Sequence, residues 1–393
     1  MKIAIVTWWY AKGMGYSENY LPEALASLGH EVHVISSDLQ PDFPNYKEAY
    51  EPFIGSQQQP VGMEKVGGYT LHRLPHRRTN FGIYIDKLHE CLNRLDPDIV
   101  QCFGIPQTST YQAVFYCLLH KKPLFLEEHT HLSTLRPPES WRHTVNNMLV
   151  KYVLGPYVAI ASRHCYAIAA DVKQVTLQHF GYPKRKLSVQ SLGVDINLFR
   201  PIQDSEDDRL RQSMRSRLGI SADEVVYIYT GRFSSDKSPH LLAKAVDLMR
   251  QQGHRVCAVF IGSGAKEDVD SIRQRDGCIV LPFMPVSELP HYYRMADVGV
   301  WPKQESTSQL DALACGLPLV LSDRVQARER IEGCVYTYKE GDHDSLAGAM
   351  LQLMSSEIRA TMGAAGAKRV RDLFSWTHIA KTRLQDYEQA LAG

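Results

Sequence analysis

Short apolar runs alternate with helical patterns along nearly the whole chain. The first run covers residues 3–7, and Leu21, Leu25 and Leu28 then recur at helical spacing. Gly29 follows, at a position where helices commonly end, and the next apolar run covers residues 32–35. This order predicts a strand–helix–strand unit. Its repetition predicts an α/β fold with parallel sheets covered by helices.

Further apolar runs predict the remaining strands, in two series. They cover residues 98–102, 123–127, 166–170 and 187–189, and then 225–230, 256–261, 298–301 and 319–321. Ser238 followed by Pro239 predicts the capped start of a helix, with Leu241, Leu242, Ala245 and Leu248 as its buried stripe. The acidic stretch 203–208 separates the two series and is typical of a linker edge. We therefore expect domains over residues 1–199 and 200–373.

Composition narrows the class of protein. A chain of 393 residues is long enough for two cores, and its formal net charge of +1 argues against a dedicated nucleic-acid binder. The eight cysteines are scattered singly, which is typical of reduced core thiols in a cytosolic protein. The first apolar run is short for a signal peptide, and no run has the length of a membrane span. These features predict a cytoplasmic location.

Two cations lie on the loop after the strand expected at 225–230. Arg232 follows Gly231, and Lys237 stands just before the helix start at Ser238. An arginine offers phosphate oxygens a rigid fork, and a lysine offers a mobile point charge. A solvated surface pair is the plainer explanation. Their position at the carboxyl end of a strand favours binding of a phosphate group.

A second polar segment follows the strand expected at 298–301. Glu305 precedes Ser306, Thr307 and Ser308, which are expected to present backbone N–H groups at a helix N-terminus, where the dipole favours an anion. Asp311 lies inside that helix, placed to accept ribose hydroxyls. The alternative is an ordinary helix cap with a surface aspartate. Together with the first loop, the segment predicts a sugar-nucleotide site.

The first half offers weaker candidates. Gly13 and Gly15 follow the first strand and suit close approach of the backbone to a ligand, although the third glycine of a dinucleotide fingerprint is absent. His129 and His131 end the strand expected at 123–127. We favour His129 as a substrate contact over a structural histidine. A metal pair is least favoured because no second ligand cluster accompanies it.

Residues 141–152 mix basic and apolar side chains. With Arg77 and Arg78 in the same half, this segment suits a peripheral contact with the cytoplasmic face of a membrane. A helix packed on its own domain is the favoured alternative.

With these residues in view, the chain resembles the large family of retaining glycosyltransferases with two facing Rossmann-like domains, the GT-B fold. The resemblance covers nearly the whole chain. Its motifs are the glycine loop at 13–18, the GHEV ending at 29–32, the PDIV strand at 97–100, the GVD…F.P segment at 193–201, the GR….K grip at 231–237, the A.G.P turn at 314–318 and the start of a closing helix at 374–376.

The resemblance implies transfer of a sugar from a nucleoside diphosphate to a hydroxyl of a glycan, lipid or small molecule, with retention and without a metal or other cofactor. It implies a donor-binding second domain and an acceptor-binding first domain, onto which residues 374–393 cross back. It assigns the diphosphate to Arg232 and Lys237, the donor sugar to His129 and Glu305, and the base to backbone around Phe283 and Met284.

One segment departs from the family pattern. Only five residues separate Glu305 from Asp311, the second acid is an aspartate, and Ser306 to Ser308 replace glycines. This departure leaves an alternative interpretation open, a catalytically silent protein that binds nucleotide and scaffolds partners. A sugar-nucleotide epimerase of the same fold is a further alternative, and it would need an acid–base set in the first domain.

Overall fold

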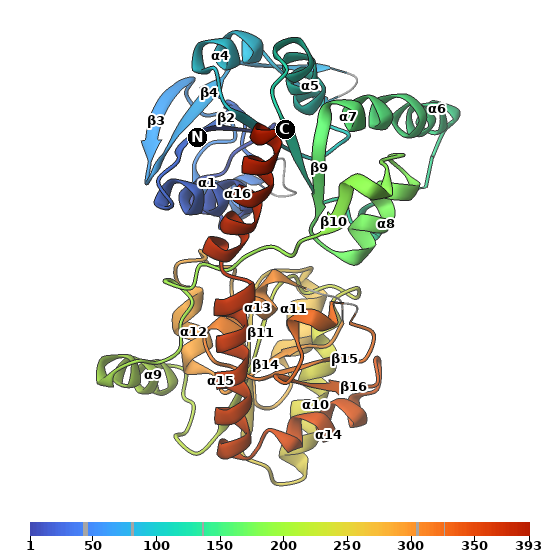
Figure 1. Cartoon of the computed structure of the whole chain (residues 1–393). Helices are drawn as coiled ribbons and strands as arrows, with labels where there is room; N and C mark the ends of the chain where they lie inside the picture. Colours follow the sequence, from blue (N-terminus) through green and yellow to red (C-terminus); the bar gives the residue numbers. More distant parts are fainter. Residues whose placement is uncertain (42–45, 80–81, 136, 304–305, 326) are drawn as a thin grey trace. The chain divides into compact units, whose positions relative to one another are not determined.

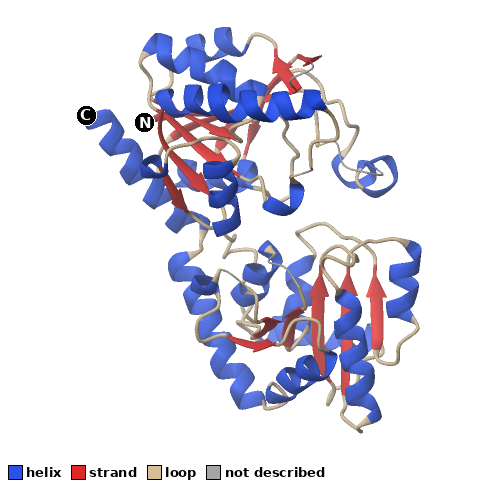
Figure 2. Ribbon diagram, turned by 90° about the vertical axis from the view of Figure 1, so that its right-hand side faces the viewer, coloured by secondary structure: helices blue, strands red, loops and turns tan. Residues whose placement is uncertain are grey.

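The computed structural model describes residues 1–41, 46–79, 82–135, 137–303, 306–325 and 327–393 (Figure 1). The chain forms two compact units, Met1–Leu192 with Trp376–Gly393, and Gly193–Ser375. In each unit, helices cover both faces of a mainly parallel sheet (Figures 1 and 2). The expected α/β class is confirmed.

The second unit begins at Gly193, seven residues before the expected boundary at 200. Val194 pairs with Ser375, and its N–H donates to the carbonyl of Phe374 at 2.8 Å. These backbone contacts attach residues 193–199 to the second unit. The same unit keeps Phe374 and Ser375, and α16 (Trp376–Ala392) belongs to the first unit.

The first unit holds an eight-stranded sheet in the order β10-β9-β8-β7-β1-β2-β4-β3. Its strands are parallel except β3, which runs antiparallel to β4, and β5 and β6 form a separate hairpin. The bounds are β1 (Lys2–Val6), β2 (Glu31–Ser37), β3 (Gly62–Val66), β4 (Tyr69–Leu74), β5 (His76–Thr79), β6 (Gly82–Ile85), β7 (Ile99–Phe103), β8 (Leu124–Glu128), β9 (Ser162–Ala167) and β10 (Leu187–Val189).

Helices and short helical turns connect these strands. They are α1 (Ser17–Ser27), α2 (Tyr46–Ala49), α3 (Glu51–Ile54), α4 (Leu88–Leu95), α5 (Thr108–His120), η1 (Leu132–Thr134), α6 (Trp141–Leu149), η2 (Val150–Leu154), α7 (Gly155–Ala161), α8 (Ala170–Gln178) and η3 (Lys184–Lys186). The C-terminal α16 packs on α1, where the rings of Tyr20 and Trp376 stack at 6.0 Å (Figure 1).

The second unit holds a six-stranded sheet in the order β13-β12-β11-β14-β15-β16, parallel throughout. The strands are β11 (Val225–Thr230), β12 (Val256–Ile261), β13 (Cys278–Leu281), β14 (Val298–Trp301), β15 (Leu319–Ser322) and β16 (Val335–Tyr338). The helices are α9 (Ser205–Arg217), α10 (Pro239–Gln251), α11 (Lys266–Arg273), α12 (Leu289–Met295), α13 (Thr307–Ala314), η4 (Arg328–Arg330), α14 (His343–Gln352) and α15 (Ser356–Leu373).

Two local predictions were wrong, and a third was right in position but not in its capping bond. The strand expected at 166–170 is the end of β9, and α8 begins at Ala170. The acidic stretch 203–208 opens α9, because Asp204 accepts the N–H groups of Glu206 and Asp207 and acidic side chains suit a helix N-terminus. Ser238 does stand at the start of α10, but its φ is +53° and its hydroxyl donates to the Ser235 carbonyl, so its side chain caps nothing.

The cysteines match the expectation of free core thiols. All eight are free, and seven are buried, with Cys278 partly exposed. Burial raises their pKa values, for example that of Cys257 to about 12. Among the helices of the described residues, none has the length and apolarity needed to cross a membrane.

Candidate functional site

The carboxyl ends of β11, β12, β13 and β14 lie along one edge of the second sheet, because these strands pair in parallel. The loops that follow these strands are 231–238, 262–264, 282–285 and the turn into α13, and all but 262–264 contain candidate residues from the sequence. A parallel sheet collects such loops at one edge, which is the usual ligand edge of an open α/β sheet. The described candidate residues of the second half therefore share one edge.

The loops after β11 and β12 are in backbone contact. Phe233 donates its N–H to the Ser263 carbonyl at 2.8 Å, and its side chain is buried. A Cβ added at Gly262 would lie 1.9 Å from the Gly231 oxygen, and one at Gly264 would lie 2.3 Å from the Phe233 oxygen. Glycine is therefore required at both positions, and this contact fixes the backbone on either side of Arg232.

The two predicted cations occupy this braced loop. The Arg232 side chain is 74% exposed, and its guanidinium lies 3.6 Å from the Asp236 carboxylate, a loose pair at the surface. Its carbonyl accepts the Tyr229 hydroxyl at 2.7 Å. Lys237 is partly buried, and its N–H donates to Ser234 in the turn that leads into α10. The backbone is held in place while the Arg232 cation faces solvent.

A buried tyrosine supports the carboxyl edge of the second sheet. The Tyr293 hydroxyl of α12 bonds the Thr230 hydroxyl at 2.6 Å, and the Trp301 indole donates to the Thr230 carbonyl at 3.0 Å. The first contact joins the end of β11 to α12, and the second joins the ends of β11 and β14. The sequence carried no signal for Tyr293, because its role depends on where α12 packs.

Helix α13 begins where the second motif predicted. Ser306 is its N-cap, and the Ser306 hydroxyl accepts the N–H of Ser308 at 3.3 Å. That N–H group is therefore already engaged, although Ser306, Thr307 and Ser308 were all expected to present theirs to a ligand. Glu305 lies outside the described residues.

Asp311 lies within α13 and is partly exposed. Burial raises the pKa of its carboxyl to about 8, and the nearby Asp195 carboxylate adds to the rise. The carboxyl therefore holds a proton at neutral pH and can donate as well as accept a hydrogen bond. Phe283 and Met284 follow β13 at the same edge and are partly buried.

In the first unit, the glycine loop lies between β1 and α1. Gly13 and Gly15 have φ values of +77° and +73°, which side chains rarely adopt. No atom lies within 4 Å of a Cβ built on Gly13. Within the unit, the positive φ rather than a lack of space therefore explains why this residue is a glycine. Trp9 packs edge-to-face against Tyr16 at 5.6 Å and against Trp8 at 5.7 Å in the same loop.

His129 directly follows β8 and is part of a buried charge cluster. Its Nε2 lies 2.6 Å from the Glu127 carboxylate, while its side chain is 38% exposed. The other oxygen of Glu127 accepts from the Arg383 guanidinium of α16, and both side chains are almost fully buried. Arg383 also lies over the Tyr166 ring and donates to Gln190.

Opposing effects set the charges in this cluster. Burial alone would raise the pKa of Glu127, but the Arg383 cation and the His129 hydrogen bond outweigh it and lower that pKa to about 2. Burial alone would lower the pKa of His129, and Glu127 raises it. Burial raises the pKa of the neighbouring Glu18 to about 7, and the Glu127 charge adds to that rise. The cluster thus combines a permanent ion pair with a glutamate and a histidine whose pKa values are both raised.

His131 makes a separate contact. Its Nδ1 lies 3.0 Å from the Asp171 carboxylate in the first turn of α8. The two histidines therefore engage different carboxylates. No group of three or more metal-ligating side chains occurs among the residues whose placement is described.

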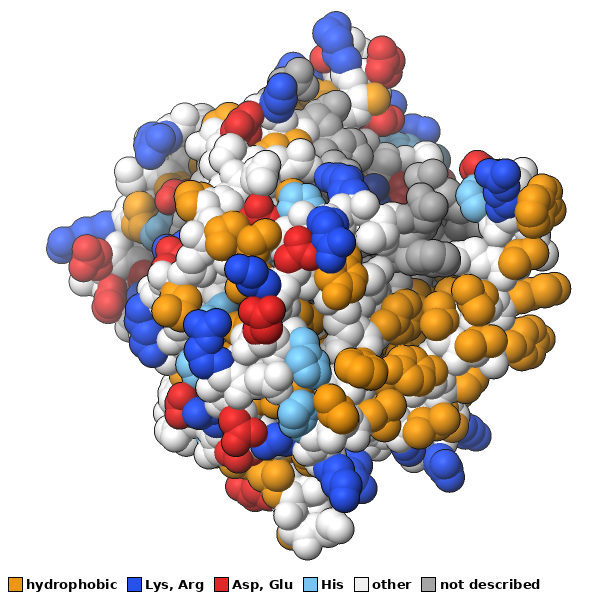
Figure 3. Space-filling model, turned by 90° about the horizontal axis from the view of Figure 1, so that it is seen from above, with side chains coloured by type: hydrophobic (Ala, Val, Ile, Leu, Met, Phe, Trp, Pro, Cys, Tyr) orange, Lys and Arg blue, Asp and Glu red, His pale blue; other side chains and the backbone are white. Residues whose placement is uncertain are grey.

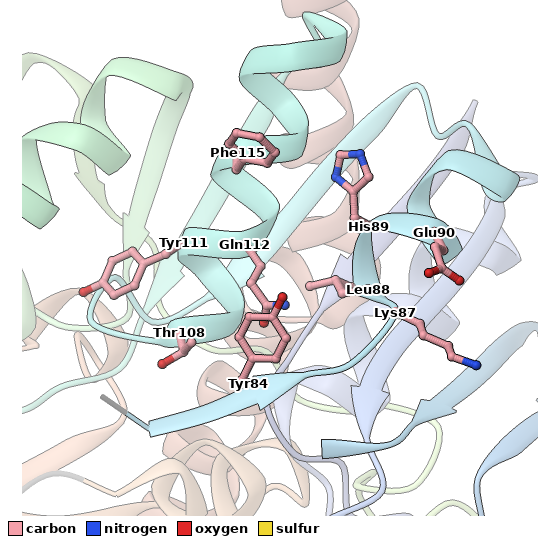
Figure 4. Close-up of a pocket in the computed structure, with 9 residues that line it drawn as sticks. All are labelled: Tyr84, Lys87, Leu88, His89, Glu90, Thr108, Tyr111, Gln112 and Phe115. Carbon is pink, nitrogen blue, oxygen red and sulfur yellow. The ribbon is translucent and has the colours of Figure 1, made fainter. Parts of the chain in front are cut away.

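A pocket of about 510 Å³ lies in the first unit between β6, α4 and α5 (Figure 4). Its walls carry the rings of Tyr84, Tyr111 and Phe115 and the amide of Gln112. The Nδ1 atom of His89 is buried there and has no hydrogen-bond partner in the described part of the chain. Sequence reasoning missed this pocket because its lining comes from two helices and a hairpin without a motif.

Two family models account for most of the chain. The model for Glycosyltransferase Family 4 matches residues 12–198, and the model for Glycosyl transferases group 1 matches residues 211–369. Their order agrees with the two units of the structure. The chain belongs to the glycosyltransferases of the GT-B fold, as its motifs indicated.

Individual relatives are distant. Spore coat protein SA of Bacillus subtilis (strain 168) is 28% identical over 237 residues, which is 56% of this chain and 63% of the relative. The chain thus spans about three fifths of the length of that relative. Two solved structures share the fold: sucrose-phosphate synthase from Thermosynechococcus elongatus (TM-score 0.68, 18% identity, 100% and 99% coverage) and Anabaena Alr3699/HepE in complex with UDP-glucose (TM-score 0.66, 15% identity, 99% and 100% coverage).

Proposed function

We propose that this protein transfers a hexose from a nucleoside-diphosphate sugar to an acceptor hydroxyl, with retention of configuration and without a metal. The observation that carries the proposal is the braced loop at the carboxyl edge of the second sheet, which presents Arg232 and Lys237 beside the N-terminus of α13. One structural relative was solved with UDP-glucose, which supports the same class of donor.

The proposed chemistry follows from charge. The leaving diphosphate gains negative charge as the glycosidic bond breaks, and the Arg232 and Lys237 cations stabilise it. A preorganised group of this kind typically lowers the barrier by about 3 kcal/mol. Asp311 bonds the ribose, the backbone near Phe283 and Met284 holds the base, and His129 and Glu305 bind the donor sugar.

Retention is proposed as same-face attack, since we assign no carboxylate as a covalent nucleophile. The acceptor, a glycan, lipid or small molecule, binds the first unit, where the pocket of Figure 4 offers aromatic walls that pack against sugar or alkyl groups. The proposed location is the cytoplasm, with the first unit in peripheral contact with the cytoplasmic face of a membrane.

A thermal-shift panel of UDP, GDP and ADP sugars tests the donor site. A ligand at 100 times its Kd raises the free energy of unfolding by about 2.7 kcal/mol. One nucleotide should raise the melting temperature, and the matching sugar nucleotide should then support transfer that survives EDTA. If no nucleotide shifts the melting temperature, the donor site is refuted. If nucleotide binds without transfer or hydrolysis, the scaffold alternative replaces the enzyme.

The acid–base groups of the first unit favour one second candidate, a sugar-nucleotide epimerase. Burial raises the pKa of Glu18 to about 7, and the Glu127 carboxylate raises the pKa of His129 in the same cluster; an epimerase needs an acid–base pair of this kind. Product analysis separates the two reactions. An epimerase converts the donor sugar without an acceptor, whereas a transferase consumes the donor in proportion to the acceptor glycosylated.

A further inference from the structure

The helical segment from α6 to α7 leaves large apolar side chains in water. Trp141, Val145, Met148 and Tyr152 are each more than half exposed, and Ile160 is 74% exposed. No described side chain of α6 is buried. The first four residues are spaced by four, three and four positions, which places them on one face of a helix. The favoured expectation that this helix packs on its own domain was therefore wrong.

A neighbouring helix extends the same surface. Helix α5 packs against α7, and its Phe115, Leu118 and Leu119 are exposed. Seen from above, hydrophobic side chains gather into one broad field on the side where α6 and α7 lie in Figure 1, with Lys and Arg side chains at its margin (Figure 3). We call the exposed apolar residues of α5, α6, η2 and α7 the apolar face. Such a field on a folded unit usually marks an interaction site.

The apolar face is held firmly on its unit. A Cβ added at Gly155 would lie 1.6 Å from the Phe180 carbonyl oxygen, and one at Gly181 would lie 2.1 Å from the Lys151 carbonyl oxygen. The backbones of the η2–α7 junction and of the turn after α8 therefore touch. This contact sets the direction in which α6 projects, although α6 itself buries nothing.

The charges around the apolar face are mainly positive. Residues 99–126 and 140–170 contain no aspartate or glutamate, whereas Lys121, Lys122, Arg142, Lys151 and Arg163 lie within them, and the exposed Glu139 precedes α6. The Arg142 guanidinium lies over the Trp141 ring at 5.6 Å, and the Lys151 ammonium lies 5.4 Å from the Tyr152 ring centroid. Each cation thus accompanies an exposed aromatic ring, an arrangement suited to the boundary between lipid headgroups and acyl chains.

We propose that the apolar face docks on an anionic lipid surface, with its apolar side chains in the headgroup–acyl boundary and its cations against lipid phosphates. The excess of cations decides between occupants, since a second copy would bring the same cations face to face. Arg77, one of the two cations expected at this contact, instead pairs with Asp86 at 2.7 Å.

This proposal goes beyond the proposed function, because it assigns the surface and the lipid chemistry of the membrane contact. Phe115 belongs both to the apolar face and to the pocket of Figure 4, so a docked enzyme would have that pocket beside the lipid. Lipid binding is measurable without donor or acceptor. A failure of docking is therefore distinguishable from a failure of sugar transfer.

Sedimentation with vesicles tests the docking. The full chain is mixed with vesicles of phosphatidylcholine alone, or of equal amounts of phosphatidylcholine and phosphatidylglycerol. We expect binding to the anionic vesicles only, weakening as salt is added. Met148→Asp should lower the bound fraction about ten-fold, because a carboxylate in the boundary is costly and repels the lipid. Lys151→Glu should lower it as well.

Met63→Asp is the matched control, since Met63 is 70% exposed on β3 of the same unit and lies outside the apolar face. It should bind like the unaltered chain, and all three variants should keep its melting temperature. Equal binding to both vesicles, no binding to either, or an equal loss with Met63→Asp would each overturn the proposal. So would a dimer that Met148→Asp dissociates, because the face would then serve a second copy.

Discussion

Arg383 of the first unit and Arg232 of the second are placed in opposite ways. In the first unit, Glu127 and Arg383 are buried and paired, and each has further partners around it. In the second unit, Arg232 is exposed on a braced backbone and pairs only loosely with Asp236. A buried pair fixes the positions of the chains that carry it. An exposed cation on a rigid loop is suited to a ligand that arrives later. The comparison contrasts a buried ion pair within the fold with an exposed cation that we propose binds a ligand.

The largest effect should come from breaking the buried pair. Arg383→Met leaves the Glu127 charge in the interior, which should lower the free energy of unfolding by about 3 to 5 kcal/mol. Urea unfolding measures it. Lys381→Met is the control, on an exposed position of the same helix, and should cost little. Adding Glu127→Gln to Arg383→Met should restore part of the loss. An Arg383→Met protein as stable as the control would show that the pair does not hold α16.

The Glu127–Arg383 pair also predicts how the stability of the protein depends on pH. The folded-state pKa of Glu127 is about 2, below its unfolded value of about 4.3. Its contribution is therefore fully present above about pH 4.3 and is lost as the pH falls toward 2. Urea midpoints between pH 6 and pH 3 should fall more steeply for the unaltered chain than for Glu127→Gln. Parallel curves would contradict the lowered pKa.

The exposed cation should matter for ligand rather than for folding. Arg232→Ala should weaken nucleoside-diphosphate binding by about 2 kcal/mol, or roughly thirty-fold, because a charge-assisted hydrogen bond to phosphate is lost. Titration calorimetry with the nucleotide found by thermal shift measures it. Arg255→Ala is the matched control, since Arg255 is also exposed and ion-paired but lies just before β12, at the amino end of the strand. Equal losses in both variants would remove Arg232 from the site.

Asp311 offers a smaller test with the opposite pH dependence from Glu127. Its folded-state pKa of about 8 exceeds its unfolded value of about 3.9, so the native state binds the proton more tightly. Stability is therefore lost progressively as the pH rises through this window. The free energy of unfolding of Asp311→Asn, relative to that of the unaltered chain, should be higher at pH 8 than at pH 5 by about 1 to 2 kcal/mol. This range is reduced because the side chain is partly exposed. Equal melting-temperature differences at both pH values would refute the raised pKa.

The smallest effect concerns the loose pair itself. Asp236→Asn should change the free energy of unfolding by less than about 0.5 kcal/mol, as exposed ion pairs contribute little. It should tighten nucleotide binding about two-fold, because a carboxylate near the diphosphate is removed. Calorimetry beside the Arg232→Ala series measures it, and weaker binding would show that Asp236 positions Arg232.

The apolar periodicity of the sequence and its helix start and stop signals predicted most of the strands and helices. Strands β11, β12 and β14 begin and end where their apolar runs do, because a strand buried on both faces is apolar along its length. The hairpin of β5 and β6 was missed, since residues 76–79 and 82–85 carry charged or mixed side chains. The stretch 203–208 was misassigned, since acidic residues suit both a linker and a helix start.

For the site, the sequence by itself determined which loops follow which strands, and the parallel order of the sheet then placed Gly231, Arg232 and Lys237 on the same edge as α13. Local chemistry is enough for this, because a strand end and a helix start are short-range features. Tertiary structure alone decided that Arg383, 256 residues after Glu127, neutralises that carboxylate, and that α6 leaves its apolar side chains uncovered. Partners so distant in the chain depend on how helices and sheets pack, and no local pattern records that packing.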